Sequence, residues 1–244
     1  MSKKYKDKVC VYCSARASAC PDHVIGREFF PNELRANLPK VPCCHVCNTK
    51  KSSLETYAMA LFPFGSAHPT AKNRLFGKVA LRLEKNINLR RELRAKMEPI
   101  WFKSRSGLIS RTITLPIRPK EIVGLFAMIL RGLYFATWNV ILPIDYFVEI
   151  YTFTLPGLVF FRNNFLSMSP NNFVEKSLGN GVFQYRATRG NVDPRISAWE
   201  MCFYNGLLIA GKGSYGKPEQ IFFCGLTGPE EAKSQMSLAD VDTT

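Results

Sequence analysis

The sequence of 244 residues predicts an α+β fold with three parts: a zinc-stapled unit, a basic helical segment, and an antiparallel sheet with a helix against it. Two Cys-x2-Cys pairs near the N-terminus have the spacing of a structural zinc site. A lysine- and arginine-rich pattern of helical period follows them. In the second half, short runs of branched and aromatic residues alternate with Gly and Asn turns, which is typical of antiparallel strands.

The positive charge of the chain is concentrated in its first half. The net charge is +14 and the isoelectric point is about 9.5. Residues 1–118 hold 23 Lys and Arg against 8 Asp and Glu, a net of +15, whereas residues 119–244 hold 10 against 11, a net of −1. We therefore expect a polyanionic partner on the half that carries the cysteine pairs, with a solvated basic face as the alternative.

The first predicted part covers residues 1–65. A lysine-rich stretch over 1–9 is expected to be flexible. Residues 9–60 form the zinc unit and end in a helix from about 49 to 61, which the Pro and Gly of residues 63–66 break. No apolar run follows the first residues, so we expect no signal peptide and a cytoplasmic protein, in which paired cysteines bind zinc rather than form disulfides.

The second predicted part, residues 66–118, contains a long amphipathic helix over 70–97, with a break near 86–88. Its apolar positions Phe76, Val79, Leu83 and Ile87 recur at three- and four-residue steps. The remaining positions are strongly basic, which favours contact with a phosphate backbone, although a solvated surface helix has the same pattern. The basic residues assigned to nucleic-acid binding here are Lys78, Arg82, Arg90, Arg91 and Arg94.

The third predicted part, residues 119–228, combines a helix over 120–138 with a sheet. Residues 122–142 are apolar and about long enough to span a bilayer, but Arg131 near the middle favours a helix buried against the sheet and no membrane contact. An acidic, loose tail is expected over 229–244. The predicted strands cover 108–115 in the second part and then 145–155, 158–161, 181–188, 197–209 and 220–226, with Gly turns at 179–181 and 211–213.

The chemistry of the zinc unit lies in the residues between and after its cysteine pairs. Cys10 with Cys13 and Cys44 with Cys47 each place two thiolates on a tight turn, as a tetrahedral zinc site requires. Cys43 remains an alternative ligand to its neighbour Cys44. The intervening stretch is longer than a compact zinc ribbon needs, and it holds Asp22, His23 and Asn37.

Together these motifs resemble the zinc-containing branch of the HNH endonucleases. The resemblance rests on Cys10-x2-Cys13, Asp22-His23-Val24-Ile25, Asn37-Leu38 and Cys44-x2-Cys47-Asn48-x-Lys50, and it covers about residues 9–60. It implies a ββα-metal, treble-clef-like fold and a metal-dependent nuclease that hydrolyses phosphodiester bonds in DNA. Asn48 stands where many relatives have the final His, so the chain resembles an H-N-N variant.

The resemblance also implies a role for each residue. His23 would be the general base, Asp22 and Asn48 would hold one divalent cation, Mg2+ or Mn2+, and Asn37 would orient the site unless it is an ordinary turn residue. Lys50 and Lys51 would touch phosphate. Glu55 would assist the cation or pair with a nearby base.

Two further aspects stay open at the level of sequence. The C-terminal part could serve as a dimerisation surface, as a module for a regulatory partner or as a sensor. The resemblance suggests phage defence or a mobile element as the biological setting. The alternative to an enzyme is a non-catalytic zinc module that binds nucleic acid. Such a module keeps the cysteines and the basic helix, and treats Asp22, His23 and Asn48 as incidental.

Overall fold

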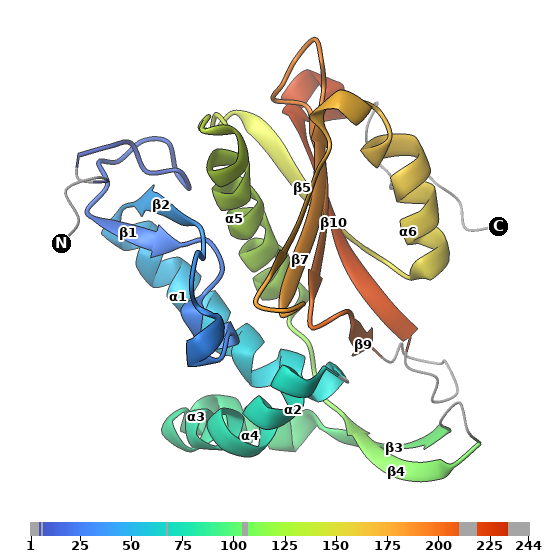
Figure 1. Cartoon of the computed structure of the whole chain (residues 1–244). Coiled ribbons are helices and arrows are strands. Elements are labelled where there is room, and N and C mark those ends of the chain that lie inside the picture. The colour runs from blue at the N-terminus through green and yellow to red at the C-terminus, as the bar shows by residue number, and fades with distance from the viewer. Residues whose placement is uncertain (1–4, 6, 67, 104–106, 210–218, 234–244) are drawn as a thin grey trace.

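A six-stranded antiparallel sheet forms the centre of the C-terminal half in the computed structural model, which describes residues 5, 7–66, 68–103, 107–209 and 219–233 (Figure 1). The strand order is β5-β10-β8-β7-β6, and the short β9 pairs with β10. This confirms the predicted antiparallel sheet. The strands are β5 (Tyr146–Phe153), β6 (Val174–Leu178), β7 (Phe183–Arg189), β8 (Ser197–Phe203), β9 (Leu207–Ile209) and β10 (Glu219–Pro229).

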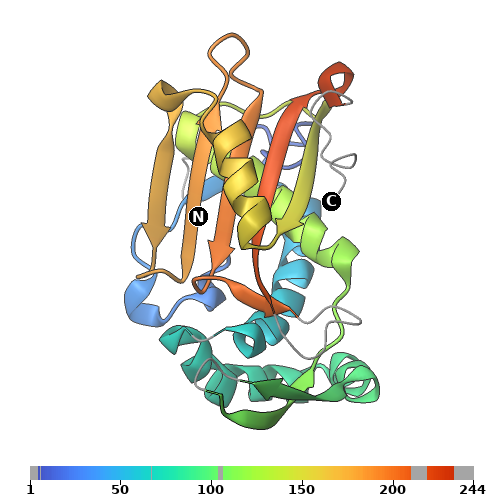
Figure 2. The same cartoon turned by 90° about the vertical axis from the view of Figure 1, so that its right-hand side faces the viewer.

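The two faces of this sheet are covered by different helices, α5 (Pro119–Trp138) on one side and α6 (Leu155–Phe161) on the other (Figure 2). Every residue of the central strand β8 is buried for this reason. The predicted strand over 158–161 is wrong, because these residues belong to α6. A proline in the first turn suits a helix start, and Leu158 and Phe161, three residues apart, both reach the sheet beside Leu226.

Helix α5 confirms the predicted helix against the sheet. By length and composition it is the one helix in the described ranges that is apolar enough to cross a membrane, but 56% of its most apolar window is buried inside the protein. The Arg131 guanidinium donates hydrogen bonds to the carbonyl oxygens of Leu142, Pro143 and Tyr146 at 3.0–3.1 Å. Arg131, whose charge interrupts the apolar run, thus binds the segment that follows α5.

The N-terminal unit consists of two short strands followed by a helix. Strands β1 (Cys20–His23) and β2 (Lys40–Cys43) pair antiparallel, with His23 opposite Lys40. Helix α1 (His45–Leu61) starts four residues before the predicted position. The reason is Cys44, whose sulfur accepts a hydrogen bond from the backbone N–H of Cys47 and caps the helix.

The basic segment forms a series of short helices rather than one long helix. The predicted break is confirmed at Asn86, whose side chain caps the last helix by accepting from the Leu89 N–H at 3.1 Å. The break rotates the apolar face, so Leu89 and Leu93 are buried while Ile87 is exposed. Strand β3 was not predicted, whereas β4 was. The elements are α2 (Pro69–Arg74), a π-helical turn (Leu75–Val79), α3 (Ala80–Lys85), α4 (Ile87–Lys96), β3 (Glu98–Lys103) and β4 (Ile109–Thr114).

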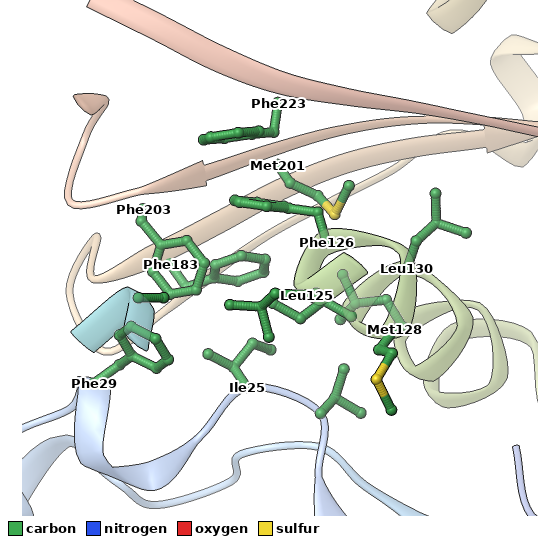
Figure 3. Close-up of a cluster of buried hydrophobic side chains, with 14 of the residues drawn as sticks. Ile25, Phe29, Leu125, Phe126, Met128, Leu130, Phe183, Met201, Phe203 and Phe223 are labelled. Atoms are coloured by element: carbon green, nitrogen blue, oxygen red, sulfur yellow. The ribbon is translucent and has the colours of Figure 1, made fainter. Parts of the chain in front are cut away.

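One hydrophobic core joins the N-terminal unit to the C-terminal sheet (Figure 3). The Phe29 ring lies 4.7 Å from the Phe203 ring between centroids, and Phe203 also contacts Phe62 at 5.3 Å. Phe126 of α5 stacks on Phe223 of β10 at 3.8 Å. The core of the zinc unit is therefore continuous with that of the sheet.

Some of the predicted segments lie outside the described residues. These are the turn at 211–213, residues 234–244 of the tail, and residues 1–4 and 6 of the start.

Candidate functional site

The four paired cysteines converge at one point. The sulfurs of Cys10, Cys13, Cys44 and Cys47 all lie within 4.8 Å of one another, and those of Cys13 and Cys44 are 4.0 Å apart. A tetrahedron of Zn–S bonds of about 2.3 Å places its sulfurs about 3.8 Å apart, so the cluster fits a zinc ion. Cys43 is not in this group; its thiol bonds the Cys44 carbonyl oxygen. The cluster can therefore hold a metal such as zinc. Its ligand from the neighbouring pair of cysteines is Cys44 rather than Cys43, as the Cys-x2-Cys spacing predicts.

The cluster joins the start of α1 to the turn at residues 10–13, and one helical turn beyond Cys47 lies a buried lysine. The Lys51 side chain is fully buried, and its ammonium donates to the Glu55 carboxylate at 2.6 Å, to the His23 carbonyl oxygen at 2.7 Å and pairs with Asp22 at 3.0 Å. Burial alone lowers the pKa of Lys51, but the carboxylates of Glu55 and Asp22 outweigh it and raise the pKa. Lys51 is therefore a charged tether between α1 and β1.

This position corrects the expectation that Lys51 touches phosphate, because its ammonium is enclosed by protein groups. Lys50, its neighbour, is exposed and can still contact a phosphate group. The pair Lys51–Glu55 at a spacing of four residues was the signal in the sequence, since such pairs face each other on a helix. Tyr12, which sequence reasoning did not single out, also belongs to the network: its hydroxyl donates to Asp22 at 2.6 Å.

The geometry of Asp22 leaves one carboxylate oxygen available. Tyr12 and Lys51 both bond to Oδ2, and within the described residues Oδ1 has no hydrogen-bond partner. The carboxylate is thus fixed in orientation on one side only. A carboxylate held in this way can still offer Oδ1 to a hard cation, which prefers oxygen ligands.

Asn48 lies on the same stripe of α1 as the lysine that reaches Asp22. It precedes Lys51 by three residues and Glu55 by seven, and residues at these steps share one face of a helix. Asn48 is half-buried, and its amide makes no hydrogen bond to any residue that the structure describes. The first turn of α1 therefore presents an amide oxygen without a partner in the described residues, on the stripe of the helix that also carries Lys51.

His23 is half-buried at the end of β1, and its ring also makes no hydrogen bond within the described part of the chain. Burial lowers the pKa of the imidazole to about 4, and the charges of Lys40 and Arg27 add to the effect. The ring is therefore neutral at physiological pH, with a nitrogen lone pair free to accept a proton. Lys40 and Arg27 were not singled out from the sequence, and they make the surroundings of His23 positive.

Asn37 lies in the loop between β1 and β2 and is exposed. Its φ is +60°, in the left-handed region that Asn tolerates better than most residues. This gives Asn37 a role in the turn that leads into β2. In the described residues its side chain contacts neither Asp22 nor His23 through a hydrogen bond.

The basic residues assigned to the helical segment lie in two places: Lys78 lies beside the β1–β2 loop, and the others lie on α3 and α4. Lys78 pairs with Glu28 at 3.3 Å, and Arg35 bonds the same carboxylate at 2.9 Å, so this part of the helical segment lies beside the β1–β2 loop. Arg91 and Arg94 are exposed on α4, while Arg82 and Arg90 are half-buried. The assigned residues thus remain on the surface of the basic segment, and Lys78 is the one joined to the loop that follows His23.

Replacing the buried lysine is expected to destabilise the protein severely. Lys51→Met leaves Asp22 and Glu55 facing each other without a cation, and breaking a buried ion pair typically costs about 3–5 kcal/mol. The free energy of unfolding of the zinc-loaded protein, from urea titration, measures this loss. Lys50→Met is the matched control and should change it by about 0.5 kcal/mol or less, because Lys50 is exposed. Equal losses in both variants would contradict the tether.

Comparisons with known proteins add no family to this picture. No family model, no curated protein and no solved structure matches the chain.

Proposed function

We propose that the protein is a metal-dependent endonuclease of the HNH type that hydrolyses phosphodiester bonds in DNA. The observation that carries the proposal is that three polar side chains of the zinc unit, two at the end of β1 and one in the first turn of α1, keep groups available to a ligand. His23 and the amide of Asn48 are half-buried without hydrogen-bond partners in the described residues, and Asp22 keeps Oδ1 free. Such half-buried polar groups are open to water in the free protein and are therefore available to a ligand.

Each side chain has a role that suits its chemistry. His23, neutral at physiological pH, accepts a proton from the attacking water. Asp22 Oδ1 and the Asn48 amide oxygen are the donors for a divalent cation, Mg2+ or Mn2+. When bound, such a cation supplies positive charge that stabilises the phosphate and the leaving oxygen. Tyr12 and Lys51 hold the carboxylate of Asp22 in place.

The charge of the chain supports a nucleic acid as the substrate. The net charge of +14 is concentrated in residues 1–118, and Arg27 and Lys40 lie beside His23. A phosphate backbone is the common polyanion that matches an extended basic surface.

A non-catalytic zinc module that binds nucleic acid is the second candidate. One observation favours it: the carboxylate of Asp22 already accepts bonds from Tyr12 and Lys51, as a purely structural carboxylate would. The cysteine cluster and the basic segment serve this function equally well. Cleavage separates the two candidates.

The direct test uses supercoiled plasmid and single-stranded DNA with the zinc-loaded protein. We expect cutting with Mg2+ or Mn2+ and none with EDTA, with the zinc content measured in each sample so that loss of the structural ion is not mistaken for loss of the catalytic one. DNA binding without cutting under every metal condition would favour the non-catalytic module.

Affinity for DNA is expected to fall steeply with salt. Each phosphate contact contributes about 0.9 to the slope of log K against log salt concentration, so replacing Arg91 and Arg94 by Gln should reduce the slope by about 2. Fluorescence anisotropy with a labelled duplex over a range of salt concentrations measures it. Lys176→Gln, which removes an exposed charge from β6 of the sheet, is the control and should leave the slope unchanged. A slope equal in all three proteins would exclude α4 from the contact.

A further inference from the structure

A cavity of about 570 Å³ lies at the C-terminal end of α1, and none of the four cysteines of the cluster lines it. Its walls come from four places: the turn after α1, the β3–β4 hairpin, the first turns of α5, and β9 with β5 and β10 of the sheet. These segments are far apart in the sequence. Representative lining residues are Phe64, Ile113, Val123, Thr152, Leu208 and Phe223.

The lining is mainly apolar. No charged side chain from the described residues contributes to it, and the polar side chains that do are those of Thr114 and Thr152. Phe64, Ile113 and Leu208 each keep 41–46% of their surface exposed, although they line a concave site. Water in such a cavity finds few hydrogen-bond partners, so an apolar molecule can displace it with a gain in free energy.

The floor of the cavity is held by contacts that need no ligand. Gly65 packs against the backbone of Leu208 so closely that an added Cβ would lie 3.0 Å from the Leu208 carbonyl oxygen. The Ser66 hydroxyl donates to the Tyr204 carbonyl oxygen at 3.0 Å. Phe223 is stacked on Phe126 of the core. The site is therefore formed before a ligand binds, which reduces the entropy lost on binding.

From this we infer that the cavity binds a small, uncharged and mainly apolar molecule. Its volume lies within the range of about 300–1,000 Å³ that is typical of small-molecule sites, and those sites are mostly apolar with a few polar groups. The lack of charge in the lining disfavours nucleotides and phosphates. The inference is independent of the proposed cleavage of DNA, because none of the residues around His23 lines the cavity.

The test uses Nile red, an uncharged dye that fluoresces in apolar surroundings, with 1-decanol as a competitor. We expect the signal to saturate at one dye per chain and to fall when 1-decanol is added. Leu208→Trp, which fills the cavity from β9, should weaken dye binding by about tenfold or more. Thr152→Trp fills it from β5 and should have the same effect, which guards against a folding defect in one variant.

Leu155→Trp is the matched control, because Leu155 is an exposed leucine on α6 that does not line the cavity. It should leave dye affinity within about twofold of that of the unchanged protein. Circular dichroism and zinc content establish that all variants are folded. Dye binding that does not saturate, or that resists both filling substitutions, would overturn the inference. So would sedimentation showing a dimer that Leu208→Trp dissociates, because the face would then belong to a second copy.

Discussion

His23→Ala is expected to abolish cleavage while leaving zinc content and DNA affinity intact. Removing a general base typically costs a factor of about 10²–10⁴ in rate. The ring of His23 makes no hydrogen bond to the described residues, so its loss breaks no contact that holds the hairpin to α1. That tie comes from the backbone carbonyl oxygen of the same residue, which accepts from Lys51 at 2.7 Å and is retained in the variant.

The measurement is the rate of plasmid cleavage with Mg2+, together with anisotropy for DNA affinity and metal analysis for zinc. His45→Ala is the matched control: it changes a histidine of the same unit whose side chain is exposed at the start of α1. We expect this control to cut at close to the unchanged rate. A His23→Ala protein that still cuts DNA would remove the proposed base, and equal losses in both variants would point to damage to the zinc unit.

Loss of the structural ion is expected to unfold the N-terminal unit. Structural zinc sites contribute about 10–16 kcal/mol of binding free energy in small peptides, which is comparable to the whole stability of a typical domain, about 5–15 kcal/mol. Cys44→Ser should be harmful through the metal alone, because the Cys44 sulfur belongs to the cluster, whereas a serine hydroxyl can still cap α1. We expect the zinc content to fall and the melting temperature to drop sharply.

Cys20→Ser provides the control for the zinc prediction. Cys20 lies outside the cluster, and its thiol makes a weak contact to the Cys43 carbonyl oxygen at 3.8 Å. Zinc content and melting temperature should change little. Cobalt substitution gives a second readout, because thiolate-to-cobalt absorption reports the number of sulfur ligands directly. A Cys44→Ser protein with full zinc occupancy and unchanged melting would contradict the assignment and return Cys43 to consideration as the ligand.

The parts of the fold that were predictable are those set by short-range chemistry. The Cys-x2-Cys spacing predicts the cluster because each pair sits on one turn, and Asn86 caps a helix by the same local logic. The run over 158–161 failed because four apolar residues fit a strand and a helix equally well. Its helical state follows from the sheet face that Leu158 and Phe161 cover, which the sequence alone does not show.

In the candidate site, too, features set by local sequence were predictable and features set by long-range packing were not. Asp22, His23 and Asn48 were predicted from their position between and after the cysteines, and the structure places Asp22 and His23 on one strand and Asn48 in the first turn of α1. For Lys51, the spacing of four residues to Glu55 indicates an ion pair, but such pairs are mostly exposed, so the sequence does not indicate that this lysine is fully buried. Tyr12 lies ten residues before its partner Asp22, a spacing with no local pattern to reveal it.

The continuous core bears on how such a protein can change over generations. Phe29 and Phe62 of the N-terminal unit pack on Phe203 of the sheet, and Phe62 also contacts Phe126 of α5. A recombination junction placed after residue 65 would therefore expose both rings to water and strip α5 of its neighbour α1. We therefore expect the zinc unit to fold poorly when it is joined to a different sheet, and we expect size changes in one ring of this aromatic cluster to call for matching changes across it.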